Sequence, residues 1–229
     1  MTGSVLAISE YGDSDGPPVV MLHGSGGPRD RERLVTECAP QRRWICPHLR
    51  GFGASLKSPP WTLEQYAQDL AATLDSLQVE RTDVIGASLG GSVALGFAEL
   101  MPALVRSVVV LDAAVCTPEH YLSRRTIEDA TPTIAALQMS ISENLPPSLK
   151  TFTGSVLILA SGASTKHNVT ESGTTALRSQ LGPRLHVLTI TDAGHDLLKD
   201  AFDDTVSEIR RFLENADRAS AKIVERVSD

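Results

Sequence analysis

The stretch Gly86-Ala87-Ser88-Leu89-Gly90 lies between a predicted strand and a predicted helix. Before it, residues 82–85 end in an apolar run typical of a short strand, and after it residues 91–98 are small or apolar, as in a buried helix. A serine in a G-x-S-x-G pattern at such a junction predicts a nucleophile elbow, a turn so sharp that only small residues fit beside the serine. This turn would hold the Ser88 hydroxyl over the sheet, at the positive end of the new helix. Ser88 is therefore the candidate nucleophile.

Short apolar strands alternate with amphipathic helices along the rest of the chain. Besides 82–85, strands are expected at residues 4–11 (an edge strand), 19–22, 44–46, 105–111, 156–159 and 185–190. Helices with one apolar face are expected at residues 62–77 and 201–213. This alternation predicts an α/β fold with a doubly wound, mostly parallel sheet flanked by helices.

About forty residues separate the strand that ends at Asp112 from the one that starts near Val156, which is too many for a plain connection. The segment is rich in Pro, Ser and Thr, and two helices are predicted in it, at residues 118–130 and 133–144. An excursion of this size is expected to be a small helical lid over the carboxyl edge of the sheet.

The chain is expected to form a single domain over residues 1–229, with the lid inserted at about residues 117–153. If the lid covers the candidate nucleophile, side chains from Tyr121 to Met139 should line the cavity nearest Ser88.

Composition excludes several classes of function. The chain has 229 residues, 41% of them hydrophobic, and a mean hydropathy of −0.04, which suits one well-formed core. A net charge of −7 and the absence of any Lys/Arg run longer than two residues argue against a nucleic-acid partner. No apolar run approaches the roughly 20 residues of a membrane span, so no membrane partner is expected.

The cysteines and the N-terminal residues bear on the compartment. Cys38, Cys46 and Cys116 are odd in number and widely spaced, which fits neither a disulfide framework nor a zinc site. Residues 1–5 carry no basic stretch followed by a long apolar run, as a secretory leader would. These features predict a cytoplasmic protein, because a reducing compartment suits unpaired thiols.

Four segments stand in a fixed order along the chain: His23-Gly24-Ser25-Gly26-Gly27, Arg50-Gly51-Phe52-Gly53-Ala54-Ser55, Gly86-Ala87-Ser88-Leu89-Gly90 and Ala193-Gly194-His195. This order and spacing resemble the α/β-hydrolase superfamily, particularly its compact members with a short lid. The resemblance covers roughly residues 19–213 and implies the fold described above together with hydrolysis of an acyl substrate.

A serine hydroxyl is a poor nucleophile near pH 7 and needs a general base within hydrogen-bond reach. His195 is the best candidate, because it follows the last strand, where this superfamily places its catalytic histidine. The N–H of Leu89, just after the nucleophile, and the N–H of Ser25 in the glycine loop are the expected oxyanion donors. Gly24, in the same loop, is expected to belong to the same oxyanion and substrate-binding region. His23 is expected to shape that loop rather than to carry protons.

The acid of the triad is not where the superfamily usually has it. Members commonly carry an aspartate in the loop after the strand at residues 156–159, but here no carboxylate occurs before Glu171. A minority of members use an acid one strand earlier, and Asp112 occupies that place. Asp112 is therefore the candidate that orients His195. Asp192 and Asp196 are expected to be surface groups.

Two smaller departures concern His48, which stands where the superfamily often has an aspartate, and Ala87, where a bulkier residue commonly precedes the nucleophile. Residues 50–55 are expected to form a structural turn near the site. Neither departure removes the chemistry.

The leading interpretation is a serine hydrolase that cleaves a small or medium carboxylic ester, thioester or carbon–carbon acyl substrate through an acyl-enzyme, with no metal or organic cofactor. The alternative is a biosynthetic enzyme that uses the scaffold for elimination, cyclisation or rearrangement, favoured by the missing usual acid. A third class is a catalytically weak ligand-binding protein, which the intact serine–histidine pair argues against. The sequence leaves the oligomeric state open.

Overall fold

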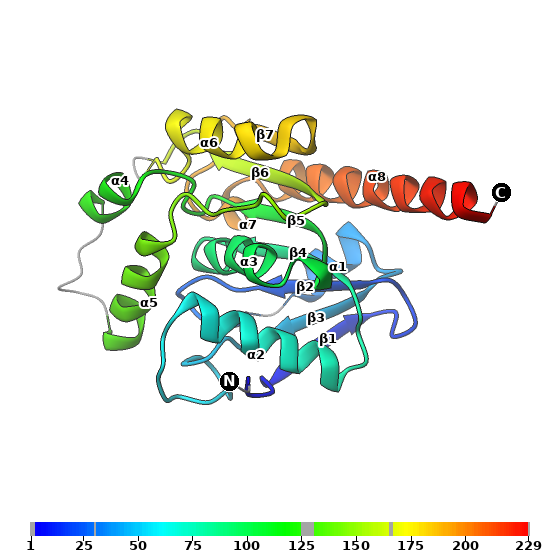
Figure 1. Cartoon of the computed structure of the whole chain (residues 1–229), viewed down its shortest axis with the longest axis horizontal. Coiled ribbons are helices and arrows are strands. Elements are labelled where there is room, and N and C mark those ends of the chain that lie inside the picture. Colours follow the sequence, from blue (N-terminus) through cyan, green and yellow to red (C-terminus); the bar gives the residue numbers. More distant parts are fainter. Residues whose placement is uncertain (1–2, 30, 125–130, 165–166, 229) are drawn as a thin grey trace.

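The computed structural model describes residues 3–29, 31–124, 131–164 and 167–228, with side chains in the last helix described as far as Arg218. A seven-stranded sheet runs through the centre in the order β1-β3-β2-β4-β5-β6-β7 (Figure 1). The strands are β1 (Ile8–Gly12), β2 (Pro18–Leu22), β3 (Arg43–Pro47), β4 (Thr82–Ala87), β5 (Val105–Leu111), β6 (Ser155–Ser161) and β7 (Leu185–Ile190).

The predicted fold class is confirmed. The edge strand β1 pairs antiparallel with β3, and all the other neighbours pair parallel. Parallel strands need crossover connections, which explains the helical segments between them. The first strand begins only at Ile8, later than the expected residue 4.

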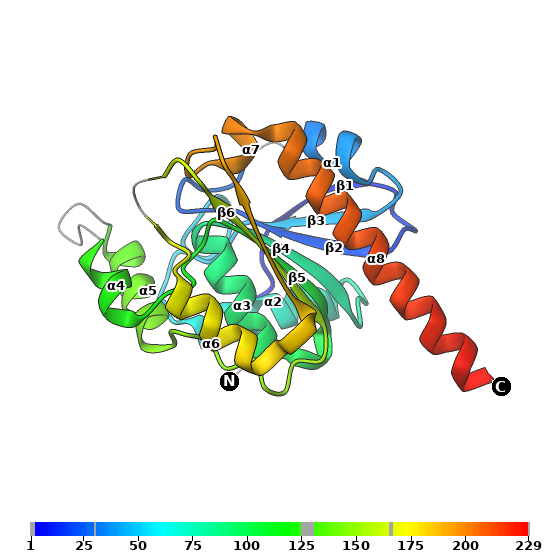
Figure 2. The ribbon, with the colours of Figure 1, turned by 90° about the horizontal axis from the view of Figure 1, so that it is seen from above.

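Helices cover both faces of the sheet (Figure 2). The helices on one face are α2 (Leu63–Ser76), α3 (Leu89–Leu100) and α6 (Glu171–Leu181). Those on the other face are α1 (Glu32–Cys38), α7 (Leu197–Asp200) and α8 (Phe202–Ser228). The predicted helix at residues 62–77 is α2, for which the Thr62 side chain accepts a hydrogen bond from the N–H of Gln65, as an N-cap does.

The last helix is longer than predicted. It was expected to end near residue 213, but α8 continues to Ser228 and extends past the sheet (Figure 2). Phe212 and Leu213 are its last side chains buried against the sheet among the described residues, and the turns after them mix charged residues with apolar ones such as Ala216 and Val224. In the described part of the chain, no helix has both the length and the apolar character required of a membrane span.

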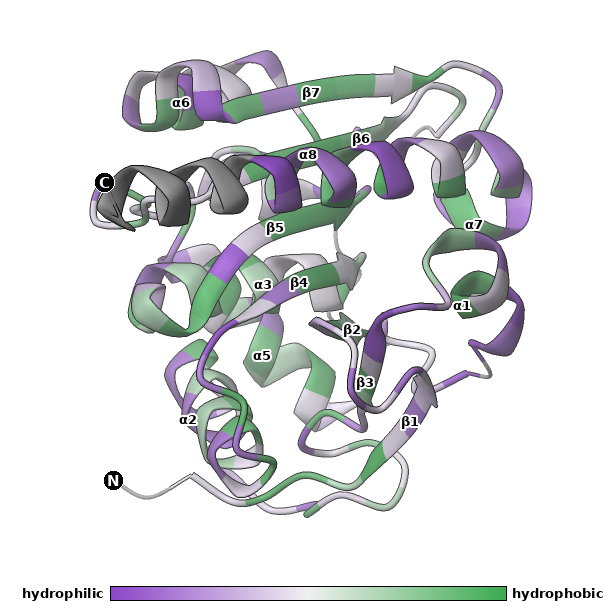
Figure 3. Ribbon diagram, turned by 90° about the vertical axis from the view of Figure 1, so that its right-hand side faces the viewer, coloured by the Kyte–Doolittle hydropathy of each residue, from purple (hydrophilic) through white to green (hydrophobic). Residues whose placement is uncertain are grey.

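The core lies on both sides of the central strands, because these strands are apolar on both faces. Six of the seven residues of β5 are buried, and β6 is similarly buried. Figure 3 shows hydrophobic residues along these two strands and hydrophilic residues on the outward turns of α8.

Between β5 and β6 the chain forms α4 (Pro118–Ser123) and α5 (Pro132–Glu143), which lie together at one end of the molecule (Figures 1 and 2). The predicted helix at 118–130 thus ends earlier, and residues 125–130 lie outside the described residues. The helix predicted at 133–144 is α5, which contacts α2. Its side chains Leu137 and Ile141 are buried in the core cluster on the α2 and α3 side of the sheet.

The topology brings the candidate residues to one edge of the sheet. The strand order reverses between β2 and β4, and ligands of such sheets bind outside the carboxyl ends of the strands at that point. The register pairs Leu22 with Gly86 and Ala87 with Leu111. The residues that follow these strands, among them Ser88 and Asp112, therefore emerge side by side.

Candidate active site

Ser88 occupies the turn between β4 and α3 and has a strained backbone, with φ 51° and ψ −116°. A Cβ on Gly86 would lie 2.2 Å from the Gly90 carbonyl oxygen. A Cβ on Gly90 would lie 2.5 Å from the carbonyl oxygens of both Leu22 and His23. Both glycines are therefore required by close backbone approach, as the elbow pattern predicts.

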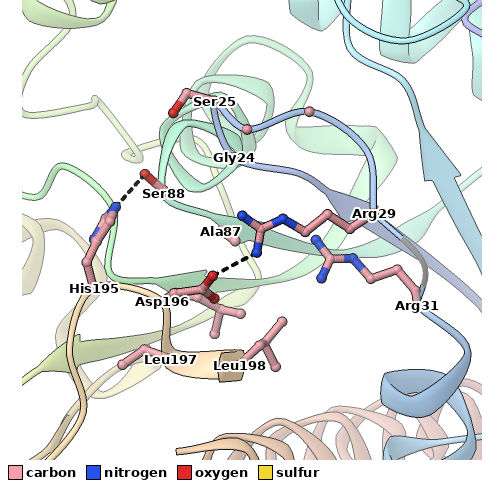
Figure 4. A pocket seen from close by; sticks show the side chains of 13 residues that line it. Gly24, Ser25, Arg29, Arg31, Ala87, Ser88, His195, Asp196, Leu197 and Leu198 are labelled. Carbon is pink, nitrogen blue, oxygen red and sulfur yellow. Dashed lines mark hydrogen bonds and ion pairs between the residues drawn. The ribbon is translucent and has the colours of Figure 1, made fainter. Parts of the chain in front are cut away.

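Three side chains from three different loops form a continuous hydrogen-bonded line. Ser88 Oγ lies 2.9 Å from His195 Nε2 (Figure 4), and His195 Nδ1 lies 2.6 Å from Asp112 Oδ2. Asp112, the candidate to orient His195, therefore lies within hydrogen-bond distance of its ring. These residues follow β4, β7 and β5, so the parallel sheet alone brings them together.

The hydrogen-bond partners define the protonation pattern of this line. The ionised carboxylate of Asp112 can only accept hydrogen bonds, so Nδ1 of His195 carries the hydrogen. Nε2 is then an acceptor and takes the hydrogen bond from the Ser88 hydroxyl. This is the tautomer that a general base for a serine requires.

Asp112 is held by its own set of donors. It is 2% exposed and has φ 43°, in the left-handed region that aspartate tolerates better than most residues. Its Oδ1 accepts the Ser161 N–H at 3.1 Å, and its Oδ2 accepts the Asn168 side-chain amide at 3.0 Å. Both contacts supply hydrogen-bond partners that a buried carboxylate needs.

The sequence analysis missed Asn168. This residue lies in the loop after β6, where the superfamily usually carries its acid. Its amide nitrogen contacts Asp112 Oδ2, the Asp112 carbonyl at 3.1 Å and His195 Nδ1 at 3.2 Å. Because Nδ1 donates to Asp112, the Asn168–His195 contact is a packing contact between two donors. The signal that could have identified Asn168 is its place in the sequence: it is a polar amide in the loop where the superfamily usually carries its acid.

The glycine loop after β2 faces the elbow. The carbonyl of Gly24 accepts hydrogen bonds from His23 Nδ1 at 2.8 Å and from the N–H of Gly27 at 3.1 Å. Within the described part of the chain, the N–H groups of Ser25 and Leu89 donate to no protein acceptor. Two unpaired donors beside Ser88 suit an oxyanion.

His23 has the structural role that the sequence predicted. It is 3% exposed, and its Nε2 accepts the Leu49 N–H at 3.0 Å while Nδ1 binds Gly24. Burial lowers its pKa to about 4, with smaller contributions from His48 and Arg31 and an opposing one from the Gly24 carbonyl. His23 is therefore neutral at pH 7 and ties the glycine loop to the segment after β3.

Arg50 also has a structural role, as predicted for residues 50–55. Its guanidinium donates to both carboxylate oxygens of Asp69, at 2.6 Å and 2.9 Å, in a buried ion pair. Its carbonyl accepts the Tyr66 hydroxyl at 2.7 Å. His48 Nδ1 accepts the Ala54 N–H at 3.1 Å and so holds the same turn.

A cavity of about 130 Å³ opens beside the Ser88–His195 pair (Figure 4). It is lined by the glycine loop, the stretch before α1 and the segment after β7: Gly24, Ser25, Gly26, Gly27, Arg29, Arg31, Ala87, Ser88, Leu111, His195, Asp196, Leu197 and Leu198.

One expectation fails here. Among the described residues, none from Tyr121 to Met139 lines this cavity, because Tyr121 and Leu137 are buried against the core instead and Met139 is exposed away from it. Asp196 lies at the surface, as expected, and also lines the cavity, where it pairs with Arg29. The described residues contain no cluster of three His, Cys, Asp or Glu side chains that could hold a metal ion.

The chain belongs to the alpha/beta hydrolase fold family, whose model matches residues 17–141, more than half of its length. The superfamily resemblance is therefore confirmed.

Relatives in this family carry several hydrolase names. The chain is 35% identical over 104 residues to a 2-hydroxy-6-oxo-2,4-heptadienoate hydrolase of Pseudomonas putida, covering 43% of this chain and 38% of that protein. It is 33% identical over 110 residues to the lipase LipV of Mycobacterium tuberculosis, covering 48% and 42%. The matched part thus spans about two fifths of these relatives.

Solved structures extend the likeness in fold over nearly the whole chain. A thermophilic esterase from Thermogutta terrifontis superposes with a TM-score of 0.74 at 23% identity, covering 92% of this chain and 93% of that one. A hydrolase from Pseudomonas aeruginosa superposes with a TM-score of 0.75 at 18% identity, covering 91% and 94%. At these identities the superpositions establish the fold alone.

Proposed function

We propose that the protein is a serine hydrolase that cleaves a small or medium carboxylic ester, thioester or carbon–carbon acyl substrate through an acyl-enzyme. The observation that carries the proposal is the line from Ser88 Oγ through His195 to the buried Asp112 carboxylate, at 2.9 Å and 2.6 Å. Ser88 and His195 line a cavity that is also lined by the glycine loop.

In the first half of the reaction, Ser88 Oγ attacks the acyl carbon while its proton passes to His195 Nε2. The negative charge that develops on the substrate oxygen is accepted by the N–H groups of Ser25 and Leu89. Asp112 stabilises the imidazolium that forms. The leaving group then takes the proton from Nε2 and departs, which leaves an ester on Ser88.

In the second half, water takes the place of the leaving group. His195 Nε2 removes a proton from the water as it attacks the acyl-enzyme, and returns that proton to Ser88 Oγ when the acid product leaves. The site needs neither a metal nor an organic cofactor for these steps.

The names of the relatives support hydrolysis over the other classes. One is named as a lipase and another as a dienoate hydrolase, which keeps both ester and carbon–carbon cleavage within the proposal. The non-hydrolytic alternative drew its support from the missing acid after β6. Asp112 supplies a carboxylate within hydrogen-bond distance of His195, so this support is lost.

The test is labelling of the protein with a fluorophosphonate probe, followed by peptide mapping. We expect one adduct, on Ser88, and none in Ser88→Ala. Ser92→Ala, which replaces a buried serine one turn along α3, is the matched control and should label as the wild type does. Turnover of Ser88→Ala within a few-fold of wild type, or labelling at another serine, would contradict the acyl-enzyme mechanism.

A further inference from the structure

The cavity beside Ser88 contains two arginines, from the stretch that joins the glycine loop to α1. Arg29 and Arg31 both extend their guanidinium groups toward the region of Ala87 and Asp196 (Figure 4). In a chain of net charge −7, a pocket lined by two cations at the candidate nucleophile is a local reversal of charge.

Arg29 already has a partner. Its Nη1 lies 2.8 Å from Asp196 Oδ2, across the mouth of the cavity (Figure 4). The side chains are 58% and 40% exposed, so the pair contributes little to stability, but the two charges balance each other.

Arg31 is different. Its side chain is partly buried, and burial lowers the pKa of its guanidinium. Within the described part of the chain, this guanidinium forms no hydrogen bond or ion pair. Asp196, the acidic group that acts on its charge, is the one paired with Arg29.

Among the described residues, no other group near Arg31 supplies a carboxylate that balances its charge. The Cys46 thiol has a pKa raised to about 12 by burial, so it is neutral at pH 7. Arg29 repels it. A partly desolvated cation without a counter-charge is unfavourable, and it becomes favourable when an anion binds.

We propose that Arg31 binds a carboxylate of the substrate, so that the enzyme acts on acyl compounds that carry a second, ionised carboxyl group. The planar guanidinium matches a carboxylate with two parallel hydrogen bonds. One unbalanced positive charge fits one carboxylate better than a phosphate dianion. Because Arg31 and Ser88 line the same small cavity, one molecule can reach both. This inference rests on the proposed function.

The kinetic test compares esters that differ only in charge. Monomethyl adipate and methyl 6-methylheptanoate place a carboxylate or its neutral isostere on the acyl side, and 3-acetoxybenzoate and 3-isopropylphenyl acetate do so on the alcohol side. We expect wild type to prefer the acidic ester in at least one pair, and Arg31→Gln to lower that ratio of kcat/KM by about 10- to 100-fold.

Arg33→Gln is the matched control. It removes the same charge from an exposed position on α1, two residues away and outside the cavity, and should keep the wild-type ratio. A wild type without any preference for the acidic esters, or an Arg31→Gln variant with an unchanged ratio, would overturn the proposal.

A binding measurement separates this proposal from the proposed function. Titration calorimetry of Ser88→Ala with monomethyl adipate reads the carboxylate site without turnover. We expect binding at least 10-fold weaker in Ser88→Ala/Arg31→Gln. If no ester is hydrolysed and no probe labels Ser88, this Arg31-dependent binding still supports the carboxylate site while the proposed function fails. Equal binding by both variants, or tighter binding of methyl phosphate than of monomethyl adipate, overturns the carboxylate site.

Discussion

Asp112 and His195 are 83 positions apart, yet Asp112 Oδ2 accepts a hydrogen bond of 2.6 Å from His195 Nδ1. The carboxylate comes from the end of β5, one strand before the place that the superfamily usually uses. The Ser161 N–H donates to the other oxygen, Oδ1, and the Asn168 side-chain amide donates to Oδ2 itself. The acid is therefore built into the sheet edge rather than placed on a flexible loop.

Replacing the acid by its amide tests this arrangement. Asp112→Asn should lower kcat by about 10⁴-fold, because an amide no longer favours the tautomer in which Nε2 of His195 accepts the serine proton. Steady-state kinetics on an ester substrate measure the loss. Asp192→Asn, at an exposed position near His195 in the sequence, is the control and should stay within a few-fold of wild type. Survival of most activity in Asp112→Asn would instead indicate a serine–histidine dyad.

Asn168 is predicted to position the acid and the base. Asn168→Leu should lower kcat by about 10-fold, because Asp112 Oδ2 loses a donor. Asn168→Asp should move the acid limb of the pH–rate profile to higher pH, since a second carboxylate beside His195 favours the imidazolium. Asn215→Asp adds the same charge on an exposed turn of α8 and should leave the profile in place. An unmoved profile in Asn168→Asp would assign Asn168 a purely structural role.

The elbow and its partners were predictable because their signals are local. Ser88 is marked by glycines that the close approach of Leu22 and His23 demands. Asp112 directly follows β5, which is buried over six of its seven residues, and His195 lies in the loop after β7. Parallel strands bring such ends to one edge, so the site followed from the fold.

The lining of the cavity was not predictable in the same way. It depends on which side of the sheet α5 packs, and Leu137 and Ile141 could have covered the site as well as the core. Asn168 escaped because an amide was not among the residue types sought for a triad. The position of Arg31 depends on the path of the loop before α1, which no periodicity fixes.

The elbow glycines make a prediction about stability. Gly90→Ala should lower the free energy of unfolding by about 1–3 kcal/mol, because the new Cβ meets two backbone oxygens that cannot move aside. Denaturant unfolding measures the change. Gly96→Ala is the control in the same helix: its Cβ would meet only Leu63 side-chain carbons at 3.3 Å, and alanine is the better helix former by about 1 kcal/mol. Equal losses in both variants would remove the steric argument.

The buried His23 ring, which binds the glycine loop, makes the free energy of unfolding depend on pH. Burial of the ring disfavours its protonated form, so the pKa of His23 falls from an ordinary 6.5 to about 4. Between these two pH values the unfolded chain binds a proton here that the folded chain does not. Stability from this site is therefore complete above pH 6.5 and is lost as the pH falls toward 4.

The expected loss from His23 alone is about 3 kcal/mol of unfolding free energy between pH 7 and pH 4, at 1.36 kcal/mol per unit of pKa shift. Urea unfolding at several pH values measures it by comparison with His23→Gln, in which nothing titrates at this position. The variant should be less stable at pH 7, because it loses the hydrogen bonds of the His23 ring to the Gly24 carbonyl and the Leu49 N–H. The two stability curves should converge toward pH 4. His186→Gln gives the background effect of replacing an exposed histidine. A constant difference between wild type and His23→Gln across this range would show that burial of His23 does not control the acid stability of the fold.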